Sequence, residues 1–259
     1  MERQAAKHFL RIQPQFTGLL GCGRRVMYFD YERDTKKYYQ NDLIASRYHR
    51  LYTASKGLRT FPFRFVARRE QRIVGTLLGN VVHRHVLDIP AGTGKLADVF
   101  ARSGSHVVAC DVSSNMLEIA KKEYLRINYA NVEYAIADAV NLNHFADATF
   151  DVVVCLRLLH RVPPGIRCRM LREFSRVAPF ALVSYGIDTA YHNLRERVRN
   201  KITGCKPVAK CFCSLAEARR EIEPFFEIQR ESRIARGVSR ELVFSLKSRV
   251  GTTQQQAAF

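Results

Sequence analysis

Residues Val86–Ala97, with the sequence VLDIPAGTGKLA, decide the fold class of this chain. An apolar run ends in an acid, turns through two glycines and opens into an amphipathic segment, where Val99 and Phe100 share a helical face and Gly104 can end the helix. Glycine lets a backbone turn tightly and lets a ligand approach without a Cβ in the way. A strand, a glycine loop and a helix in this order predict a site for a nucleotide-type cofactor.

Two classes of cofactor fit this loop. Gly92-x-Gly94-x-x-Ala97 matches the fingerprint of dinucleotide-binding proteins, and Asp111 stands about where that fingerprint has its ribose-binding acid. Asp88 precedes the first glycine by four residues and favours a different class. A carboxylate at this place repels a pyrophosphate but attracts a sulfonium or ammonium group.

Further along the chain come Asp111-Val112-Ser113, Ala137-Asp138-Ala139 and Phe150-Asp151-Val152-Val153-Val154. This series, over residues 80–185, resembles the class I S-adenosylmethionine (SAM) methyltransferases, in the small-molecule branch that includes enzymes of quinone biosynthesis. The resemblance implies an α/β fold: a Rossmann-like, doubly wound, mostly parallel seven-stranded sheet with helices on both faces, plus a helical N-terminal part.

The alternation of apolar runs and amphipathic segments itself predicts a parallel sheet covered by helices on both faces. The predicted parallel strands are His85–Ile89, His106–Cys110, Val132–Ala137, Phe150–Cys155 and Phe180–Tyr185. Helices are expected over Asn115–Leu125, capped by Ser113 or Ser114, over Arg167–Val177, and after the capping box Ser214–Glu217. By resemblance to the family, Phe226–Arg230 and Glu241–Ser248 form an antiparallel edge.

We divide the chain into three parts. Residues 1–80 are a basic helical N-terminal cap region, residues 81–250 a SAM-dependent methyltransferase domain with a basic insertion at 186–213, and residues 251–259 a disordered tail. Within the cap region, a helix from Asn41 resembles the helix that covers the cofactor in this family, and a second helix over Phe65–Leu78 is expected beside the sheet.

The resemblance implies a cofactor site at the strand ends. Its residues would be Asp88, Ala91, Gly92, Thr93, Gly94, Asp111, Val112, Met116, Asp138, Ala139 and Cys155. Asp88 and the glycine loop would hold the methionyl end, and Asp111 both ribose hydroxyls. Asp138 would accept a hydrogen bond from the adenine amino group, while Val112 and Met116 line the adenine faces. Alternatively, Cys155 is simply a small buried residue at the end of its strand.

Two residues after the fourth strand are candidates for catalysis. His160 could remove a proton from a hydroxyl nucleophile, since its ordinary pKa is near 6.5, or it could be a structural histidine. Arg157 could orient an anionic acceptor or face solvent. No metal site is expected, because Cys205, Cys211 and Cys213 do not have a usual zinc spacing.

Charge is distributed unevenly along the 259 residues. The formal net charge is +18, with +10 in residues 1–80, +1 in residues 81–189 and +7 in residues 190–259. A basic surface attracts nucleic acid, an anionic membrane or an anionic substrate, although it can also be merely solvated. Seven cysteines without a framework indicate a reducing compartment, and no apolar run approaches the roughly 18 residues of a membrane span. We expect a cytoplasmic protein, with peripheral membrane binding as one use of its charge.

The function predicted from these features is SAM-dependent transfer of a methyl group to an oxygen or carbon of a small or lipid-like molecule. One alternative is an RNA methyltransferase that grips the polyanion with its basic flanks. Another is a non-catalytic subunit with the same fold that binds RNA or another protein.

Overall fold

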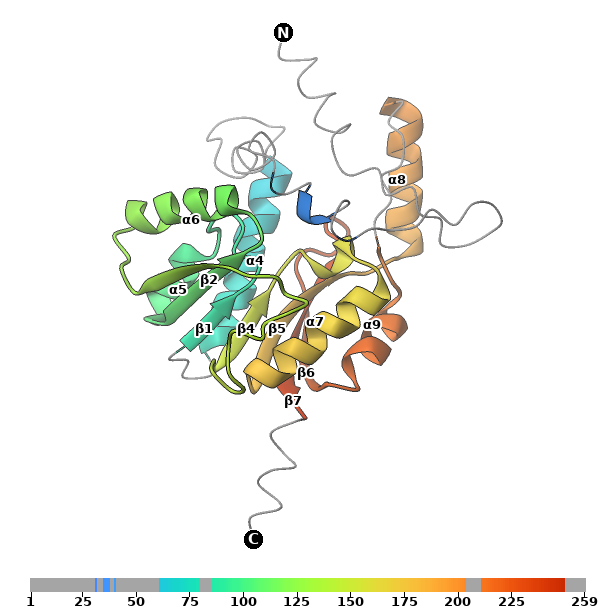
Figure 1. Ribbon diagram of the computed structural model, residues 1–259. Helices are drawn as coiled ribbons and strands as arrows, with labels where there is room; N and C mark the ends of the chain where they lie inside the picture. The colour runs from blue at the N-terminus through green and yellow to red at the C-terminus, as the bar shows by residue number, and fades with distance from the viewer. Residues whose placement is uncertain are drawn as a thin grey trace.

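The computed structural model describes Tyr31, residues 35–37, Gln40 and residues 61–79, 85–203 and 211–249. At its centre lies a seven-stranded sheet with the order β3-β2-β1-β4-β5-β7-β6 (Figure 1). The strands are β1 His85–Asp88, β2 His106–Asp111, β3 Val132–Ile136, β4 Val152–Cys155, β5 Phe180–Gly186, β6 Phe226–Arg233 and β7 Glu241–Ser248. The first five are parallel, and β7 runs antiparallel to both β5 and β6. The predicted doubly wound sheet and its antiparallel edge are confirmed.

Helices cover both faces of the sheet. They are α4 Phe61–Gly79, α5 Ala97–Ser103, α6 Ser114–Arg126, α7 Pro164–Val177, α8 Ala190–Thr203 and α9 Leu215–Ile222, with a 3-10 turn, η2, at Leu159–Arg161. Side chains of a strand alternate between the two faces of the sheet, and each face has its own hydrophobic core. Leu87 packs in the core beneath α7 and α9, and its neighbour Val86 packs in the core beneath α4, α5 and α6. None of the described helices is long and apolar enough to cross a bilayer.

Local signals in the sequence set the helix ends. Gly104 ends α5 with a φ of 66°, a left-handed conformation that glycine adopts readily. The Ser113 side chain accepts a hydrogen bond from the backbone N–H of Met116 at the start of α6, and Ser214 forms the predicted capping box with Glu217. One end of each of the helices α5, α6 and α9 therefore lies where a capping residue in the sequence predicts it.

Several predicted segments differ from the structure in extent: α7 begins three residues before the predicted Arg167, β4 begins two residues after the predicted Phe150, and β6 continues three residues beyond the predicted Arg230. The helix expected over Phe65–Leu78 begins earlier and forms α4, and half of the insertion at 186–213 is the regular helix α8. The helix predicted from Asn41 and the tail 251–259 lie outside the described residues.

Candidate functional site

The loop between β1 and α5 turns through two glycines in the left-handed region. Gly92 has a φ of 55° and Gly94 a φ of 72°. A Cβ on Gly92 would meet nothing within 4 Å, whereas a Cβ on Gly94 would lie 3.1 Å from the Cα of Ala120 in α6. Gly94 is thus needed for close packing of the loop against α6, and Gly92 leaves open space where a ligand can approach the backbone.

Asp111, at the end of β2, holds this loop in place. Its carboxylate accepts hydrogen bonds from the backbone N–H groups of Gly92, at 2.9 Å, and of Ser113, at 3.0 Å. Burial raises the pKa of Asp111 from 3.8 to about 6, although these hydrogen bonds act in the opposite direction. Each carboxylate oxygen accepts one of these two hydrogen bonds and has a second lone pair, so the carboxylate can still accept further hydrogen bonds.

Asp88, at the end of β1, is the second buried acid of the site. Its side chain is 3% exposed, and burial together with the nearby Asp111 raises its pKa well above the usual range. No hydrogen bond to the Asp88 carboxylate comes from the part of the chain that the structure describes. A ligand cation at this point would offset both burial and the repulsion between the two acids.

One cavity of about 320 Å³ joins these groups. Of the predicted cofactor residues, nine line it: Asp88, Ala91, Gly92, Thr93, Gly94, Asp111, Val112, Met116 and Ala139. A volume of this order is typical of a small-molecule site. The structure therefore brings together the ends of β1 and β2, the glycine loop and the start of α6 around a single space.

Asp138 and Cys155 are absent from the cavity lining. The Asp138 carboxylate accepts a hydrogen bond from the Tyr31 hydroxyl at 2.9 Å and lies 2.5 Å from the Lys36 ammonium. Tyr31 lines the cavity, so Asp138 ties an N-terminal residue to the site. Cys155 is fully buried at the end of β4, where burial raises the pKa of its thiol.

Arg157 lines the cavity and is ion-paired. Its guanidinium lies 2.6 Å from a carboxylate oxygen of Glu70, in α4, and 3.6 Å from one of Glu241, in β7. The side chain is 13% exposed, which excludes the expected alternative that it faces solvent. Arg157 thus connects α4 to the sheet and fixes one wall of the cavity.

His160 lies in η2 with its side chain buried and is absent from the cavity lining, whereas the next residue, Arg161, is part of it. The imidazole ring lies with its centroid 6.1 Å from that of Phe212. This environment is apolar on at least one side of the ring. It favours the structural role expected of His160, and the general-base role stays a prediction for kinetics to decide.

Helix α4 contributes residues to the site that were not predicted from the sequence. Arg64, Ala67, Arg68 and Gln71 all line the cavity. Their spacing of three and four residues places them on one helical face, and this periodicity was the signal that could have found them. Glu70 belongs to the same lining, whereas Glu241 gave no comparable signal, since it lies in β7, distant in the chain, and approaches Arg157 and Glu70 through the fold alone.

Metal-ligating residues do not gather in the described segments, where no group of three or more His, Cys, Asp or Glu side chains could hold an ion. Cys213 is buried, and its backbone forms an isolated β-bridge with Ile187, just after β5. Cys205 lies outside the described residues.

Comparisons with known proteins agree with this geometry. Residues 86–179 match a family model described as a methyltransferase domain. The demethylmenaquinone methyltransferase of Paenarthrobacter aurescens is 39% identical over 111 residues, which are 42% of this chain and 40% of that protein. The ubiquinone biosynthesis O-methyltransferase of Paracidovorax citrulli is 34% identical over 80 residues, 31% of this chain and 34% of that protein. The chain thus spans between a third and two fifths of the length of these curated relatives.

Similar folds occur among solved structures. The magnesium protoporphyrin IX methyltransferase of Synechocystis PCC 6803, crystallised with bound SAH, superposes with a TM-score of 0.69 at 18% identity, over 82% of this chain and 98% of that one. Human N-acetylserotonin methyltransferase in complex with SAM gives a TM-score of 0.58 at 11% identity, over 85% of this chain and 60% of that one. At these identities the likeness concerns the fold.

Proposed function

We propose that this chain, which carries a class I SAM-dependent methyltransferase domain, transfers a methyl group from SAM to an oxygen or carbon of a small or lipid-like molecule. The observation that carries the proposal is the pair of buried acids, Asp88 and Asp111, facing one cavity beside the glycine loop. A pyrophosphate-containing dinucleotide would add negative charge beside two buried carboxylates, of which Asp111 already raises the pKa of Asp88. A ligand with cationic groups relieves that cost.

The residues present fit SAM. When bound, this cofactor would supply a methyl group on a sulfonium centre whose positive charge disappears on transfer. Asp88 would attract its ammonium group, and the backbone beside Gly92 would receive its methionyl end. Asp111 would accept hydrogen bonds from the ribose hydroxyls while it keeps its bonds to the loop. Val112 and Met116, which both line the cavity, would contact the faces of the adenine ring.

The acceptor would enter on the side of the cavity formed by α4 and the segment after β4. Leu156 and Leu158 supply apolar surface there, and Arg64 and Arg161 supply positive charge. This lining suits a molecule with an apolar body and an acidic or strongly polar group. The two curated relatives described above are a methyltransferase of ubiquinone biosynthesis and a demethylmenaquinone methyltransferase, which supports the same class of acceptor. In-line positioning and exclusion of water would then carry most of the rate enhancement.

We also propose a reducing, cytoplasmic location. The cysteines within the described residues are all free: Cys110, Cys155, Cys168, Cys211 and Cys213. Free buried thiols without a disulfide framework are typical of a reducing compartment.

Calorimetric titration with SAM and with NAD tests the cofactor assignment. We expect SAM to bind, and Asp111→Ala to weaken its binding by about 1.5–3 kcal/mol, because charge-assisted hydrogen bonds to the ribose are lost. Asp147→Ala is the matched control, since Asp147 is an exposed acid paired with Arg176 and does not line the cavity. Tight NAD binding without a heat signal for SAM would overturn the assignment.

A screen of labelled methyl transfer into RNA, lipid and small-molecule fractions tests the acceptor class. We expect label in the lipid or small-molecule fraction. Label in RNA would favour the alternative of an RNA methyltransferase, and SAM binding without transfer into any fraction would favour a non-catalytic subunit.

A further inference from the structure

Helix α8 turns its apolar side chains away from the protein. Tyr191, Leu194, Val198 and Ile202 are 57%, 57%, 49% and 79% exposed. Their spacing of three or four residues places all four along one stripe of the helix. In Figure 1 this helix stands at the edge of the molecule, beside the main body of the sheet and its covering helices. A run of large apolar side chains on an outer helix face is unusual for a protein that functions without a partner there.

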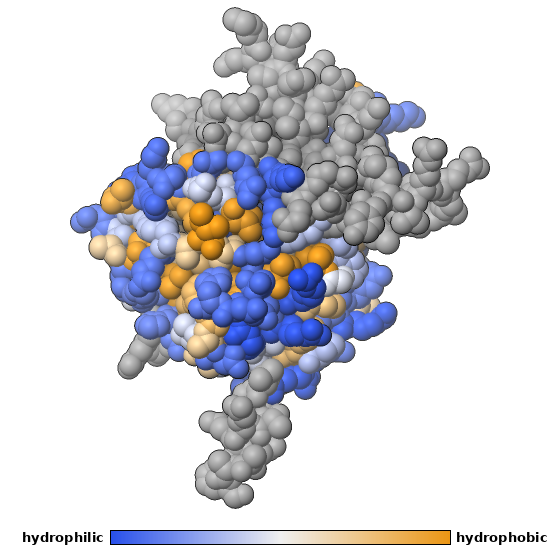
Figure 2. All heavy atoms as spheres, in the orientation of Figure 1, coloured by the Kyte–Doolittle hydropathy of each residue, from blue (hydrophilic) through white to orange (hydrophobic). Residues whose placement is uncertain are grey.

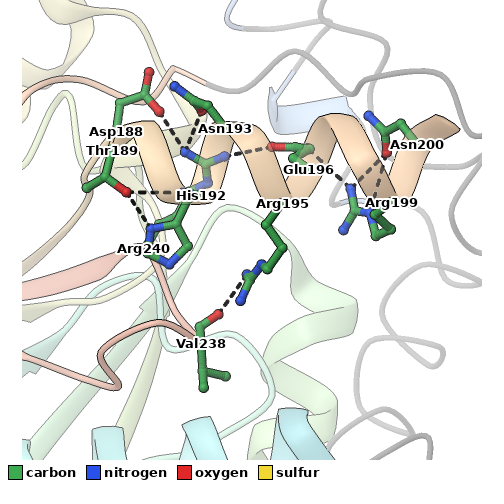
Figure 3. A network of polar contacts seen from close by, with 10 residues as sticks. All are labelled: Asp188, Thr189, His192, Asn193, Arg195, Glu196, Arg199, Asn200, Val238 and Arg240. Atoms are coloured by element: carbon green, nitrogen blue, oxygen red, sulfur yellow. Dashed lines mark hydrogen bonds and ion pairs between the residues drawn. The ribbon is translucent and has the colours of Figure 1, made fainter. Parts of the chain in front are cut away.

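The opposite face of α8 is polar and attaches the helix to the protein (Figure 3). Arg240, which is 9% exposed, donates hydrogen bonds to Asn193 and Glu196 in the helix and to Asp188 just before it, at 2.9, 2.9 and 2.6 Å. His192 is buried beside the same contacts. The polarity of α8 is therefore the reverse of that of an ordinary surface helix, whose apolar stripe faces the core.

Positive charge flanks the apolar stripe. Arg197, Arg199 and Lys201 are exposed on the two sides of it, and the helix carries four basic residues against one acid. Arg195 donates hydrogen bonds to the carbonyl groups of Gly237 and Val238. This contact brings the Val238 loop, whose valine is 41% exposed, next to the start of the stripe. Figure 2 shows the described surface of the main body as largely hydrophilic, with several apolar areas.

We propose that α8 docks this protein on the surface of an anionic lipid bilayer, with the helix axis in the plane of the interface. An apolar stripe bordered by Lys and Arg is the arrangement with which interfacial helices enter the boundary between headgroups and acyl chains, and the basic flanks match the negative charge of acidic lipids. An RNA backbone would use the basic residues but leave the apolar stripe in water. The apolar residues therefore decide between these two polyanionic surfaces.

The position of α8 suits this role. The helix follows β5, and the glycine loop follows β1, so both leave the carboxyl ends of parallel strands, which lie at one edge of the sheet. A bilayer docked on α8 would lie on the side of the protein that holds the cavity. The docking stands on α8 alone and goes beyond the proposed methyl transfer, so either can fail without the other.

A single tryptophan reports on docking, because the sequence contains none. We expect Val198→Trp to show a blue-shifted emission when vesicles of phosphatidylcholine and phosphatidylglycerol are added. Leu125→Trp is the matched control, since Leu125 is 75% exposed in α6, on the opposite side of the view in Figure 1. An unchanged emission of Val198→Trp, or equal shifts at both positions, would overturn the proposal.

Vesicle flotation measures the strength of binding. The triple variant Leu194→Gln, Val198→Gln, Ile202→Gln should lower the partition coefficient about 10–100-fold, because three side chains no longer enter the apolar boundary. Leu125→Gln with Ile136→Gln removes comparable exposed apolar groups elsewhere and should leave binding unchanged. Calorimetry with SAM checks that each variant is folded and keeps its cofactor site.

Charge reversal at Arg197→Glu and Lys201→Glu should abolish binding to the acidic vesicles but not SAM binding. Two results would contradict the proposal. In the first, the wild type binds RNA but not vesicles, and the charge variant no longer binds RNA. In the second, the wild type binds no vesicles and sediments as a dimer, which the triple glutamine variant converts to a monomer.

Discussion

Asp111 is expected to make the ligand-free protein less stable as the pH rises. Burial raises its pKa from 3.8 to about 6 in the folded state, so the folded protein holds this proton more tightly than the unfolded chain does. Between these two pKa values the folded state carries more protons than the unfolded state, and the free energy of unfolding falls with increasing pH. Above the folded-state pKa the loss is complete.

The size of the effect follows from the two pKa values. The difference between 3.8 and about 6 corresponds to about 3 kcal/mol of unfolding free energy lost between pH 3.5 and pH 7. Asp88 acts in the same direction, because burial and, to a smaller extent, the charge of Asp111 raise its pKa as well. Removing the charge of Asp111 therefore also lowers the cost of ionising Asp88.

Asp111→Asn isolates this contribution. Urea unfolding of wild type and variant at several pH values gives the difference in unfolding free energy, in which the titrating groups that do not interact with Asp111 cancel. The variant loses part of the hydrogen bonding to Gly92 and Ser113 at every pH, so the informative quantity is the change of the difference with pH. We expect the variant to gain about 3 kcal/mol relative to wild type from pH 3.5 to pH 7.

Two controls accompany this experiment. Val112→Ala changes an uncharged residue of the same cavity wall and should give a difference that does not vary with pH. Saturating SAM should reduce the pH dependence of wild type, because a cationic ligand stabilises the charged form of Asp88 and Asp111. A pH-independent difference for Asp111→Asn, or one of the opposite sign, would refute the reasoning.

Two further predictions concern residues whose expected roles are open to test. His160→Ala should change kcat less than tenfold and mainly lower the free energy of unfolding, because His160 is absent from the cavity wall and packs near Phe212; a loss of about 10²–10⁴-fold in kcat would instead establish a general base. Asp138→Asn and Lys36→Met should each weaken SAM binding by a similar factor, and the double variant by no more than either, because the two side chains act as one pair. Additive effects in that calorimetric cycle would indicate direct contact of Asp138 with the cofactor.

The sheet was predictable because its signals are local. Each parallel strand is a short apolar run, and buried strands such as Val152–Cys155 are apolar throughout. Gly104 and Ser214 end or begin helices through their own backbone and side-chain chemistry. The antiparallel edge followed from the family resemblance, since nothing in the residues of β6 and β7 fixes the direction in which they pair.

The acids of the site were predictable to different degrees. Asp88 and Asp111 end neighbouring parallel strands, so topology alone places them at one edge of the sheet. Asp138 also follows a strand, but its environment depends on Lys36 and Tyr31, about a hundred residues away. No periodicity connects residues at such a separation, and only the folded chain shows which of them meet.

Helix α8 shows the same limit at the surface. Its sequence contains an apolar stripe and basic residues, which describes equally a helix packed on a core and one lying on a membrane. What decides between these is the anchor of the helix. Arg240, more than forty residues later in the chain, takes Asn193 and Glu196 as partners and so turns the polar face inward. If this anchor orients the stripe, Arg240→Met should weaken vesicle binding even though Arg240 is itself nearly buried. Unchanged flotation of that variant would show that α8 keeps its orientation without Arg240.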